Sequence, residues 1–415
     1  TDYLSRSCAM MQQGRNVADI AYFYAETQNA TSAFKLRRPD VPKGYSYDFV
    51  NRTIVNEVLV TEGNTLVAPT GARYSALFID SEVFSITTQT LRSIARFADA
   101  GVLIVGNEPR DYADLKGDKE EFDRLVKKIW HSGKRNVRSA DEAEIALRDA
   151  GIEPDAQWLP DTGADIRFVH RCLEDGGHMY WIANISPEYR SLDVSLRVSG
   201  LKPELWHADT GIREDAGYVM DGDRTVVHLD MVPDDAVFIV LRGRTDCRES
   251  RRAKAVESEI MRIRGPWDVR FQQGRGAPEG MTMEKLHSYT EEECDGIRYF
   301  SGSAWYTNSF EYNGEGGEIW LDLGDVRNMA RVILNGRDLG NLWKKPYRTD
   351  VSQILRQGTN TLEIKVINSW TNRLIGDLQP GMEKVCYTPL NFFEADDELL
   401  PSGLLGPVKL ITILK

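Results

Sequence analysis

The sequence predicts a multidomain protein that combines an α/β part with all-β parts. Three observations indicate this class. Residues 16–150 alternate short apolar runs with amphipathic helical stretches, residues 155–245 carry short strands around a Gly-rich turn, and residues 265–415 repeat strands around an Asn-Gly turn. A length of 415 residues is enough for about two to four domains, each with its own core.

Composition and charge argue against two classes of partner. Charged residues make up 27% of the chain and hydrophobic residues 41%, as in ordinary globular proteins. The formal net charge of −12 argues against nucleic acid and anionic membranes, which attract basic faces. No apolar run approaches the roughly 20 residues of a membrane span. The five cysteines are scattered without a CxxC pair, so we expect free, mostly buried thiols.

Residues 1–15 open without an initiator Met and without the layout of a signal peptide. Ser5–Gln13 fits a helix, and Gly14 suits its C-cap. A chain that opens within a helix indicates a preceding segment, so residues 1–15 are expected to be the tail of an absent domain. A fragment, a processed subunit and a trimmed chain remain open.

Residues 16–150 are predicted to form an open parallel sheet with helices on both faces, as in flavodoxin-like or glutamine-amidotransferase-like proteins. Strands are expected at 17–24, 74–79 and 102–106, and a helix at 87–100. That helix places four apolar side chains on one face: Leu91, Ile94, Ala95 and Ala98. Two further helices are expected, one with Phe122, Leu125, Val126 and Ile129 on its apolar face and one at 142–149.

The carboxyl ends of such strands are where function is usually found. The strand at 74–79 ends in Asp80-Ser81-Glu82, without the GxCxG or GxSxG of a nucleophile elbow. We therefore expect this domain to be non-catalytic. The stretch Gly44–Asn51 is interpreted in two ways, as a pocket lining of aromatic and acidic side chains or as a loop packed over the sheet edge.

Residues 155–245 are predicted to form a small antiparallel β-sandwich. Strands at 166–173 and 178–184 flank Glu174-Asp175-Gly176-Gly177, which is a strong hairpin signal. Four histidines fall in or beside this domain, namely His170, His178, His207 and His228. Their spacing gives no metal-ligand pattern, so we predict no metal site.

Residues 246–264 are charged and lack periodicity, so they are predicted to be a solvated linker. Residues 265–415 are predicted to form a jelly-roll of the galactose-binding kind, with strands at 267–271, 297–306, 318–323, 330–334, 362–368 and 408–414. Asn335-Gly336 suits a type I′ turn, and Asp350–Gly358 suggests one helical turn stopped by glycine.

The C-terminal domain carries residue types that bind sugars. Aromatic rings stack on the C–H faces of a sugar, while Asp, Asn and Arg hold its hydroxyl groups. The candidates are Trp343, Tyr347, Arg348, Trp370, Asn372, Arg373 and Asp377. Two other interpretations stay open: Trp370 closes the end of the sandwich while Arg373 and Asp377 form an architectural ion pair, or the segment contacts an absent domain.

Several strings resemble glycoside hydrolase family 106, the α-L-rhamnosidases. They are Arg6 with Gln13-Gly14 and Val17–Ile20, Tyr45–Asn51, Gly71 with Tyr74, and Leu91 with Ala100-Gly101. Further strings at 317–324, 330–340 and 368–377 resemble that family's C-terminal jelly-roll and, more loosely, the sugar-binding domain of family 2. The likeness spans nearly the whole chain.

The resemblance implies inverting, calcium-assisted hydrolysis by two glutamates in a barrel that precedes the matched region. The chain has no room for that barrel of about 250 residues beside its other domains. We therefore assign no catalytic residue and expect no cofactor in this chain, with calcium only in the absent catalytic domain. The family also implies a secreted or periplasmic bacterial protein.

Three functions follow as hypotheses. The first is the non-catalytic C-terminal region of an α-L-rhamnosidase-like enzyme that acts on plant-type, rhamnose-containing polysaccharide, supports the barrel and contacts glycan. The second is an independent carbohydrate-binding protein that uses Trp343 and Trp370. The third is a structural or oligomerisation module without affinity for sugar.

Overall fold

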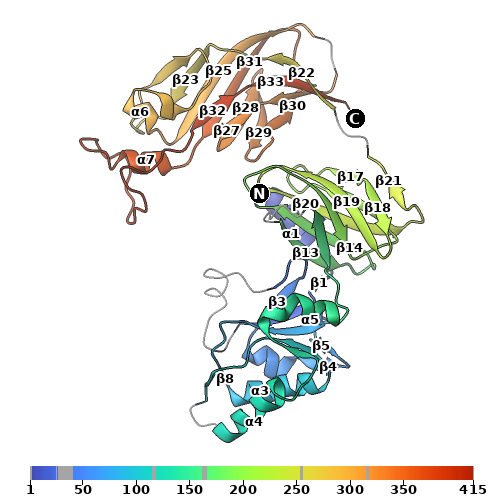
Figure 1. Ribbon diagram of the computed structural model, residues 1–415. Coiled ribbons are helices and arrows are strands. Elements are labelled where there is room, and N and C mark those ends of the chain that lie inside the picture. The colour runs from blue at the N-terminus through green and yellow to red at the C-terminus, as the bar shows by residue number, and fades with distance from the viewer. Residues whose placement is uncertain are drawn as a thin grey trace. The chain divides into compact units, whose positions relative to one another are not determined.

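The computed structural model describes residues 2–24, 26, 41–114, 118–160, 166–252, 256–314 and 317–414 (Figure 1). It divides into two compact units, Thr1–Arg252 and Ala253–Lys415. The predicted combination of an α/β part with β-rich parts is confirmed.

An open parallel sheet of five strands forms the first lobe of the first unit, as the alternating pattern predicted. Its order is β11 (Val137–Arg138), β9 (Leu103–Val105), β7 (Ala76–Ile79), β2 (Ile20–Phe23) and β3 (Tyr47–Val50). Successive residues of a strand point to opposite faces, so each strand contributes to two cores. Phe23 and Leu77 belong to one core, and Tyr22 and Phe78 to the other.

Helices cover both faces of this sheet, as the sequence predicted. Helices α3 (Thr88–Asp99) and α4 (Lys119–Trp130) pack on one face, and α5 (Ala143–Asp149) packs on the other. The four apolar residues expected on the inner face of α3 are all buried. Smaller elements complete the lobe: a π-helix at Ile54–Val58, β4 (Val60–Glu62), β5 (Thr65–Val67), β6 (Arg73–Tyr74), β8 (Ser85–Ile86), β10 (Asp111–Tyr112), β11 and a 3₁₀ turn at Ala140–Glu142.

A two-sheet antiparallel β-sandwich forms the rest of the first unit. One sheet runs β1 (Arg15–Val17), β13 (Ile166–Cys172), β14 (His178–Asn184), β20 (Asp235–Arg244), β16 (Leu201–Trp206) and β17 (Arg213–Asp215). The other runs β12 (Ala156–Leu159), β15 (Arg190–Leu196), β19 (Arg224–Met231), β18 (Tyr218–Asp221) and β21 (Glu249–Ser250). The predicted hairpin joins β13 to β14 in the register His170 to Tyr180.

The N-terminal segment lies against this sandwich. Helix α1 (Asp2–Met11) places Tyr3, Met10 and Met11 against the cluster around Met179. Strand β1 pairs with β13. Residues 1–15 were expected to be the tail of an absent domain, and the described part of this segment, from Asp2 on, contacts the sandwich.

The second unit is built from antiparallel sheets around one large core. One sheet runs β22 (Val256–Arg262), β33 (Lys409–Leu414), β26 (Ile319–Asp322) and β30 (Arg348–Asp350). The other runs β24 (Gly280–Met283), β23 (Trp267–Phe271), β25 (Ser303–Tyr312), β31 (Gly358–Ile367), β28 (Met329–Leu334) and β29 (Arg337–Leu342). Also present are β27 (Asp325–Arg327) paired with β32 (Gly403–Gly406), a 3₁₀ turn at Tyr289–Glu291, α6 (Asp295–Arg298) and α7 (Thr371–Gly376).

Some local predictions for this unit hold and others differ from the structure. Asn335 and Gly336 both have positive φ, 52° and 78°, as a type I′ turn requires. The expected strand at 297–306 is in fact the end of α6 followed by β25, because Ile297 is a core residue of a short helix. The single turn expected at 350–358 is present, with the amides of Ile354 and Leu355 both donating to Val351 O at 2.9 Å and Gly358 at φ 81°. The predicted linker at 246–264 contains β21 and β22, and β22 shows no apolar alternation in the sequence because it is mostly exposed.

The cysteines differ from prediction in their burial. All five are free thiols, but Cys8, Cys247 and Cys294 are exposed, and Cys172 and Cys386 are only partly buried. Scattered cysteines in the sequence carried no information about which face of an element they would occupy.

Candidate functional site

The carboxyl edge of the parallel sheet holds hydrogen-bonded acidic side chains. Tyr22 Oη donates to Asp80 Oδ2 at 2.7 Å, and the Glu82 amide donates to Asp80 Oδ1 at 2.8 Å. Glu26 accepts hydrogen bonds from the hydroxyls of Thr87, at 2.9 Å, and Thr90. These carboxylates tie loops to strand ends, which is an architectural use of this edge.

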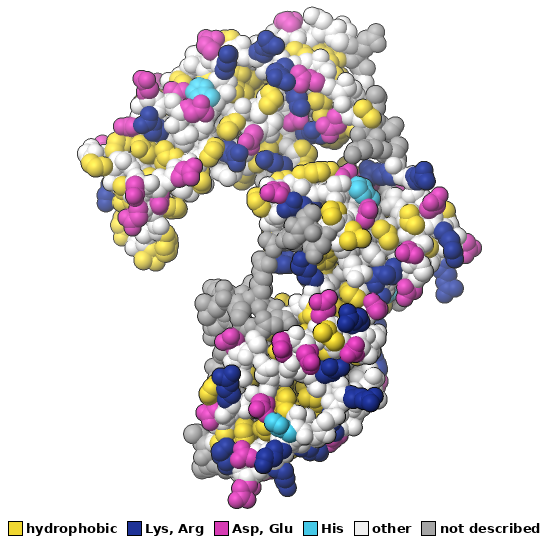
Figure 2. Space-filling model, in the orientation of Figure 1, with side chains coloured by type: hydrophobic (Ala, Val, Ile, Leu, Met, Phe, Trp, Pro, Cys, Tyr) yellow, Lys and Arg dark blue, Asp and Glu magenta, His cyan; other side chains and the backbone are white. Residues whose placement is uncertain are grey.

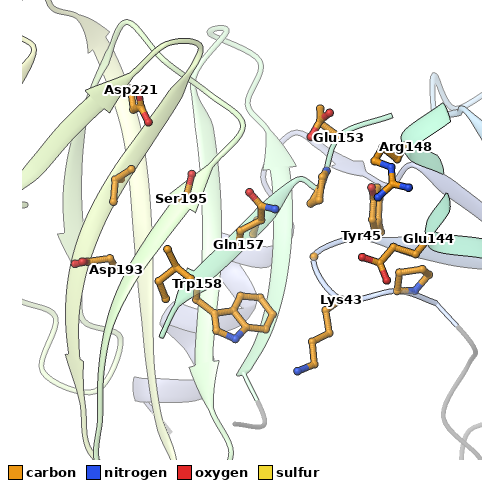
Figure 3. Close-up of a pocket in the computed structure, with 16 residues that line it drawn as sticks. Lys43, Tyr45, Glu144, Arg148, Glu153, Gln157, Trp158, Asp193, Ser195 and Asp221 are labelled. Atoms are coloured by element: carbon orange, nitrogen blue, oxygen red, sulfur yellow. The ribbon is translucent and has the colours of Figure 1, made fainter. Parts of the chain in front are cut away.

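A pocket of about 850 Å³ lies at the opposite, amino edge of the sheet, where the parallel-sheet lobe meets the sandwich (Figure 3). Lys43 and Tyr45 approach from the segment before β3, and Glu144 and Arg148 from α5. The sandwich contributes side chains from β12, β15, β18 and β19, among them Gln157, Trp158, Asp193, Ser195 and Asp221. Of the two interpretations of the stretch Gly44–Asn51, the pocket lining applies to Gly44 and Tyr45, whereas residues 47–50 form the edge strand.

The pocket wall is fixed by backbone contacts that require a glycine. Gly44 O accepts hydrogen bonds from the amides of Asp155, at 2.8 Å, and Ala156, at 3.2 Å. Gly44 has φ +85°, and a Cβ there would lie 2.4 Å from Ala156 O. From the sandwich side, Arg197 Nη1 donates to Glu153 O at 2.7 Å, and Arg224 Nη1 donates to Pro154 O at 2.9 Å.

Directly behind this wall lies a buried polar network. Asp155 Oδ2 is 2.8 Å from His170 Nδ1, and Tyr180 Oη donates to Asp155 Oδ1 at 2.8 Å. His170 Nε2 is 2.8 Å from His178 Nδ1. The rings of His170 and Tyr180 stack with centroids 3.9 Å apart. Arg197 joins the lobes, because its Nη2 donates to Asp19 Oδ1 at 2.8 Å and lies 3.6 Å from Asp155 Oδ1.

Burial and charge move the pKa values of this network in different directions. Burial opposes ionisation of Asp155, but its hydrogen bond and charge interaction with His170 hold its pKa below the usual value. Burial and the charge of His170 lower the pKa of His178 to about 4. Burial raises the pKa of Asp19 despite its contact with Arg197. The network therefore keeps His178 neutral at pH 7 beside an ionised Asp155.

The sequence did not single out this network as a site. Asp155 lies 15 positions from His170, and Arg197 meets Asp19 across 178 positions. One signal was present: the predicted hairpin pairs His170 with Tyr180 and Cys172 with His178, which places the two histidines on one face. The other histidines of the sandwich bond to acids, His207 to Glu214 and His228 to Asp193.

Four of the seven sugar-binding candidates cluster around α7 in the second unit. Trp370 is 45% exposed and lies under the guanidinium of Arg275, 4.7 Å from the ring centroid. Asn372 is buried, and its side-chain amide bonds to both backbone groups of Leu400. Arg373 is only 1% exposed, with Nε 2.9 Å from Asp377 Oδ1.

Asp377 is occupied by a loop as well as by Arg373. It accepts hydrogen bonds from the amides of Val385 and Cys386, at 3.0 and 2.9 Å, and from the Cys386 thiol. Burial opposes its ionisation, but these bonds and the Arg373 charge hold the pKa of Asp377 below its usual value. The ion pair thus fastens the segment that follows α7.

The other three candidates precede α7 in the sequence, and Tyr347 and Arg348 bond to residues outside this cluster. Tyr347 is buried and donates to Asn328 O at 2.9 Å. Arg348 binds both oxygens of Glu257, at 2.6 and 2.8 Å, and Asp322 at 2.9 Å. Trp343 follows β29 and is 44% exposed. Of the seven, the two tryptophans present the most ring surface to solvent.

Across the described ranges, no group of three or more His, Cys, Asp and Glu side chains is arranged to hold a metal ion. No described helix combines the length and apolar character that a bilayer crossing requires.

Comparison with known proteins places the chain in a family. Residues 1–220 match glycoside hydrolase family 106, described as α-L-rhamnosidase, and residues 282–386 match the galactose-binding-like domain of glycosyl hydrolase family 2. The solved structure of a rhamnosidase from Novosphingobium sp. PP1Y is 37% identical, with a TM-score of 0.79 over 99% of this chain and 40% of that one.

A curated protein of Formosa agariphila, named putative β-glucuronidase, is 22% identical over an alignment of 668 residues that covers 100% of this chain. The chain spans 57% of the length of that protein and 40% of the rhamnosidase. Since the family 106 match covers more than half of its residues, the chain belongs to glycoside hydrolase family 106, the α-L-rhamnosidases.

Proposed function

We propose that this chain is the non-catalytic C-terminal region of an α-L-rhamnosidase-type enzyme that acts on rhamnose-containing plant-type polysaccharide. The observation that carries the proposal is the sheet content. Within the described ranges, the parallel strands form one open five-stranded sheet and a two-stranded pair, and the remaining strands are antiparallel. The eight-stranded parallel barrel that the family resemblance associates with the catalytic glutamates is not among them.

The finer fold assignments support this role. In chain order the parallel sheet runs 2-1-3-4-5, which is the order of flavodoxin-like proteins, and we propose that fold for the first lobe. We propose a jelly-roll for the second unit, because two antiparallel sheets enclose its core and residues 282–386 match a galactose-binding-like domain.

An exposed apolar segment after α7 supports contact with the catalytic part of the enzyme. Tyr387, Leu390 and Phe392 are exposed at 91%, 68% and 84%. Figure 2 shows hydrophobic side chains gathered on the segment that follows α7. Large apolar side chains this exposed indicate an interaction surface. The rhamnosidase relative, of which this chain covers 40%, has further polypeptide that would supply the partner.

Hydrolysis of an aryl α-L-rhamnoside by the purified chain tests the catalytic part of the proposal. We expect no turnover by folded protein, with a full-length α-L-rhamnosidase as the positive control. Hydrolysis that is abolished by Glu144→Gln or Asp193→Asn would contradict the proposal, because those carboxylates line the pocket of the first unit. Glycoside hydrolysis normally requires two carboxylates that face each other across a cleft.

Carbohydrate binding is the second part of the proposal. The half-exposed rings of Trp343 and Trp370 favour it, because exposed aromatic faces are suited to stack on sugars. Calorimetry with rhamnose-containing oligosaccharides should detect saturable binding. By family alone, we propose a secreted or periplasmic location, and calcium only in the catalytic part.

A further inference from the structure

We propose that the pocket between the parallel-sheet lobe and the sandwich binds a neutral oligosaccharide, with Trp158 as its stacking platform. This inference rests on the proposed function, which supplies carbohydrate as the ligand class. It moves the principal sugar site to the first unit, away from the seven candidates in the second.

The size and place of the pocket support a ligand site. Its volume of about 850 Å³ falls within the roughly 300–1,000 Å³ typical of small-molecule sites. It lies at the amino edge of the parallel sheet, whereas doubly wound enzymes bind ligands at the carboxyl edge. The pocket is therefore a product of how the sandwich joins the lobe, and Gly44, at φ +85°, is the residue that permits that junction.

The lining chemistry fits a polyol. Trp158 is half-buried, packs partly against the sandwich core and also lines the pocket. Around it are exposed groups that accept hydrogen bonds and groups that donate them. Acceptors include Glu144 and Asp193, and donors include Arg148 and Gln157. A sugar hydroxyl donates one hydrogen bond and accepts others, so it matches such a mixed lining.

The charge of the lining selects against acidic sugars. Glu144, Glu153, Asp193 and Asp221 line the pocket, opposed by the two cations Lys43 and Arg148. Like charges brought together in a partly enclosed site repel, so a uronate-bearing chain is disfavoured. The preferred ligand is a neutral, rhamnose-rich oligosaccharide.

The buried network makes the wall rigid before a ligand arrives. Asp155, which lies between the lining residues Pro154 and Ala156, is held by His170 and Tyr180. Glu153, two positions before Asp155, is held through its carbonyl by Arg197. A preformed wall loses little conformational freedom on binding, which favours affinity.

The test is calorimetry of the full chain with α-linked rhamnotriose, and with a galacturonate-containing rhamnogalacturonan oligosaccharide for comparison. We expect rhamnotriose to bind more tightly than the acidic oligosaccharide. Trp158→Ala should weaken rhamnotriose binding by about tenfold or more, the effect of losing a stacked ring, and Trp158→Phe should retain part of the affinity. Gln157→Ala, at an exposed position, should weaken it by a smaller factor without affecting folding.

Trp305→Ala, at a partly buried tryptophan of β25 in the second unit, is the matched control and should leave rhamnotriose binding unchanged. Trp370→Ala tests the competing site around α7. If rhamnotriose binds with affinity lost in Trp370→Ala and unchanged in Gln157→Ala and Trp158→Phe, the pocket proposal is overturned while the proposed function stands. If well-folded chain binds neither oligosaccharide, the pocket and the carbohydrate-binding role both fall. If Trp158→Ala unfolds, the Gln157→Ala result decides between these outcomes.

Discussion

The pocket of the first unit and the α7 region of the second unit offer similar residue types in different states. Both contain a tryptophan, an arginine, an aspartate and a side-chain amide. In the pocket, Arg148, Gln157 and Asp193 are exposed. Around α7, Asn372, Arg373 and Asp377 are buried and bonded to the protein itself. Residue type alone therefore does not identify a binding site, since accessibility decides whether a polar side chain can reach a ligand.

Each region also has a buried polar group with a different task. Behind the pocket, Asp155 and His170 stabilise a wall whose outer side is polar. At α7, the Arg373–Asp377 pair fastens a segment whose tips, Tyr387 and Phe392, are apolar. The first arrangement suits a hydrophilic ligand and the second a protein surface.

Arg373→Ala should produce the largest change of stability. It removes the cation from a pair that is nearly inaccessible to solvent and leaves the Asp377 carboxylate without it. Breaking such a pair costs about 3–5 kcal/mol of unfolding free energy. Scanning calorimetry should show the transition of the second unit at lower temperature.

Arg331→Ala is the control for this prediction. Arg331 pairs with Asp338 in the same unit, but both side chains are largely exposed. Exposed pairs contribute little, so the transition should barely move. Equal losses of stability in the two variants would show that the burial of Arg373 adds nothing to the stability of the second unit. The contrast between the buried α7 residues and the exposed pocket residues would then have no energetic basis.

The network behind the pocket should make stability depend on pH. The pKa of His178 is about 4 in the folded protein, against roughly 6.5 in an unfolded chain. Below pH 6.5, His178 is therefore protonated in the unfolded chain but not in the folded protein. The free energy of unfolding falls as the pH is lowered from 6.5 to about 4. Because His178 is partly exposed, we expect a loss of about 1–2 kcal/mol, less than a fully buried group would give.

His178→Gln isolates this effect from the neighbouring acids. The lowered pKa of Asp155 gives stability that is lost only at still lower pH, while the raised pKa of Asp19 acts in the opposite direction. Both remain in the variant, so the difference between wild type and His178→Gln reports His178 alone. Urea titrations at pH 7, 5.5 and 4.5 should show a flatter profile for the variant. Parallel profiles would assign the acid sensitivity elsewhere.

The sequence predicted much of the fold because the spacing of apolar residues reflects which side chains are buried. Leu91 and Ile94 lie on the buried face of α3, and the Asn335-Gly336 turn has the expected backbone. Strand β22 was missed because its side chains are mostly exposed, so no apolar alternation marks it. Its pairing with β33, more than 140 positions away, depends on tertiary structure and not on local pattern.

The candidate site could be predicted only in fragments. The composition of the stretch Gly44–Asn51 suggests a pocket that includes Tyr45. Nothing local in the sequence links Trp158 and Asp193 to it, because they meet Tyr45 only through the docking of two lobes. Conversely, Arg373 and Asp377 were open to two interpretations, a sugar site or an architectural ion pair, and only the structure shows that both side chains are buried with Nε and Oδ1 2.9 Å apart. Spatial juxtaposition, not residue identity, was the missing information.

Trp370→Ala should lower stability less than Arg373→Ala or the protonation of His178 does, and it sharpens the comparison between the two regions. The substitution removes the ring under Arg275, a half-exposed cation–π contact of about 0.5–1 kcal/mol. A shift of that size in the second unit, with unchanged sugar binding, would mark Trp370 as part of the architecture around α7. Loss of sugar binding at unchanged stability would instead mean that Trp370 stacks on sugar even while it contacts Arg275. The second unit would then bind carbohydrate through its surface, and the Arg373–Asp377 pair would only position the loop that follows α7.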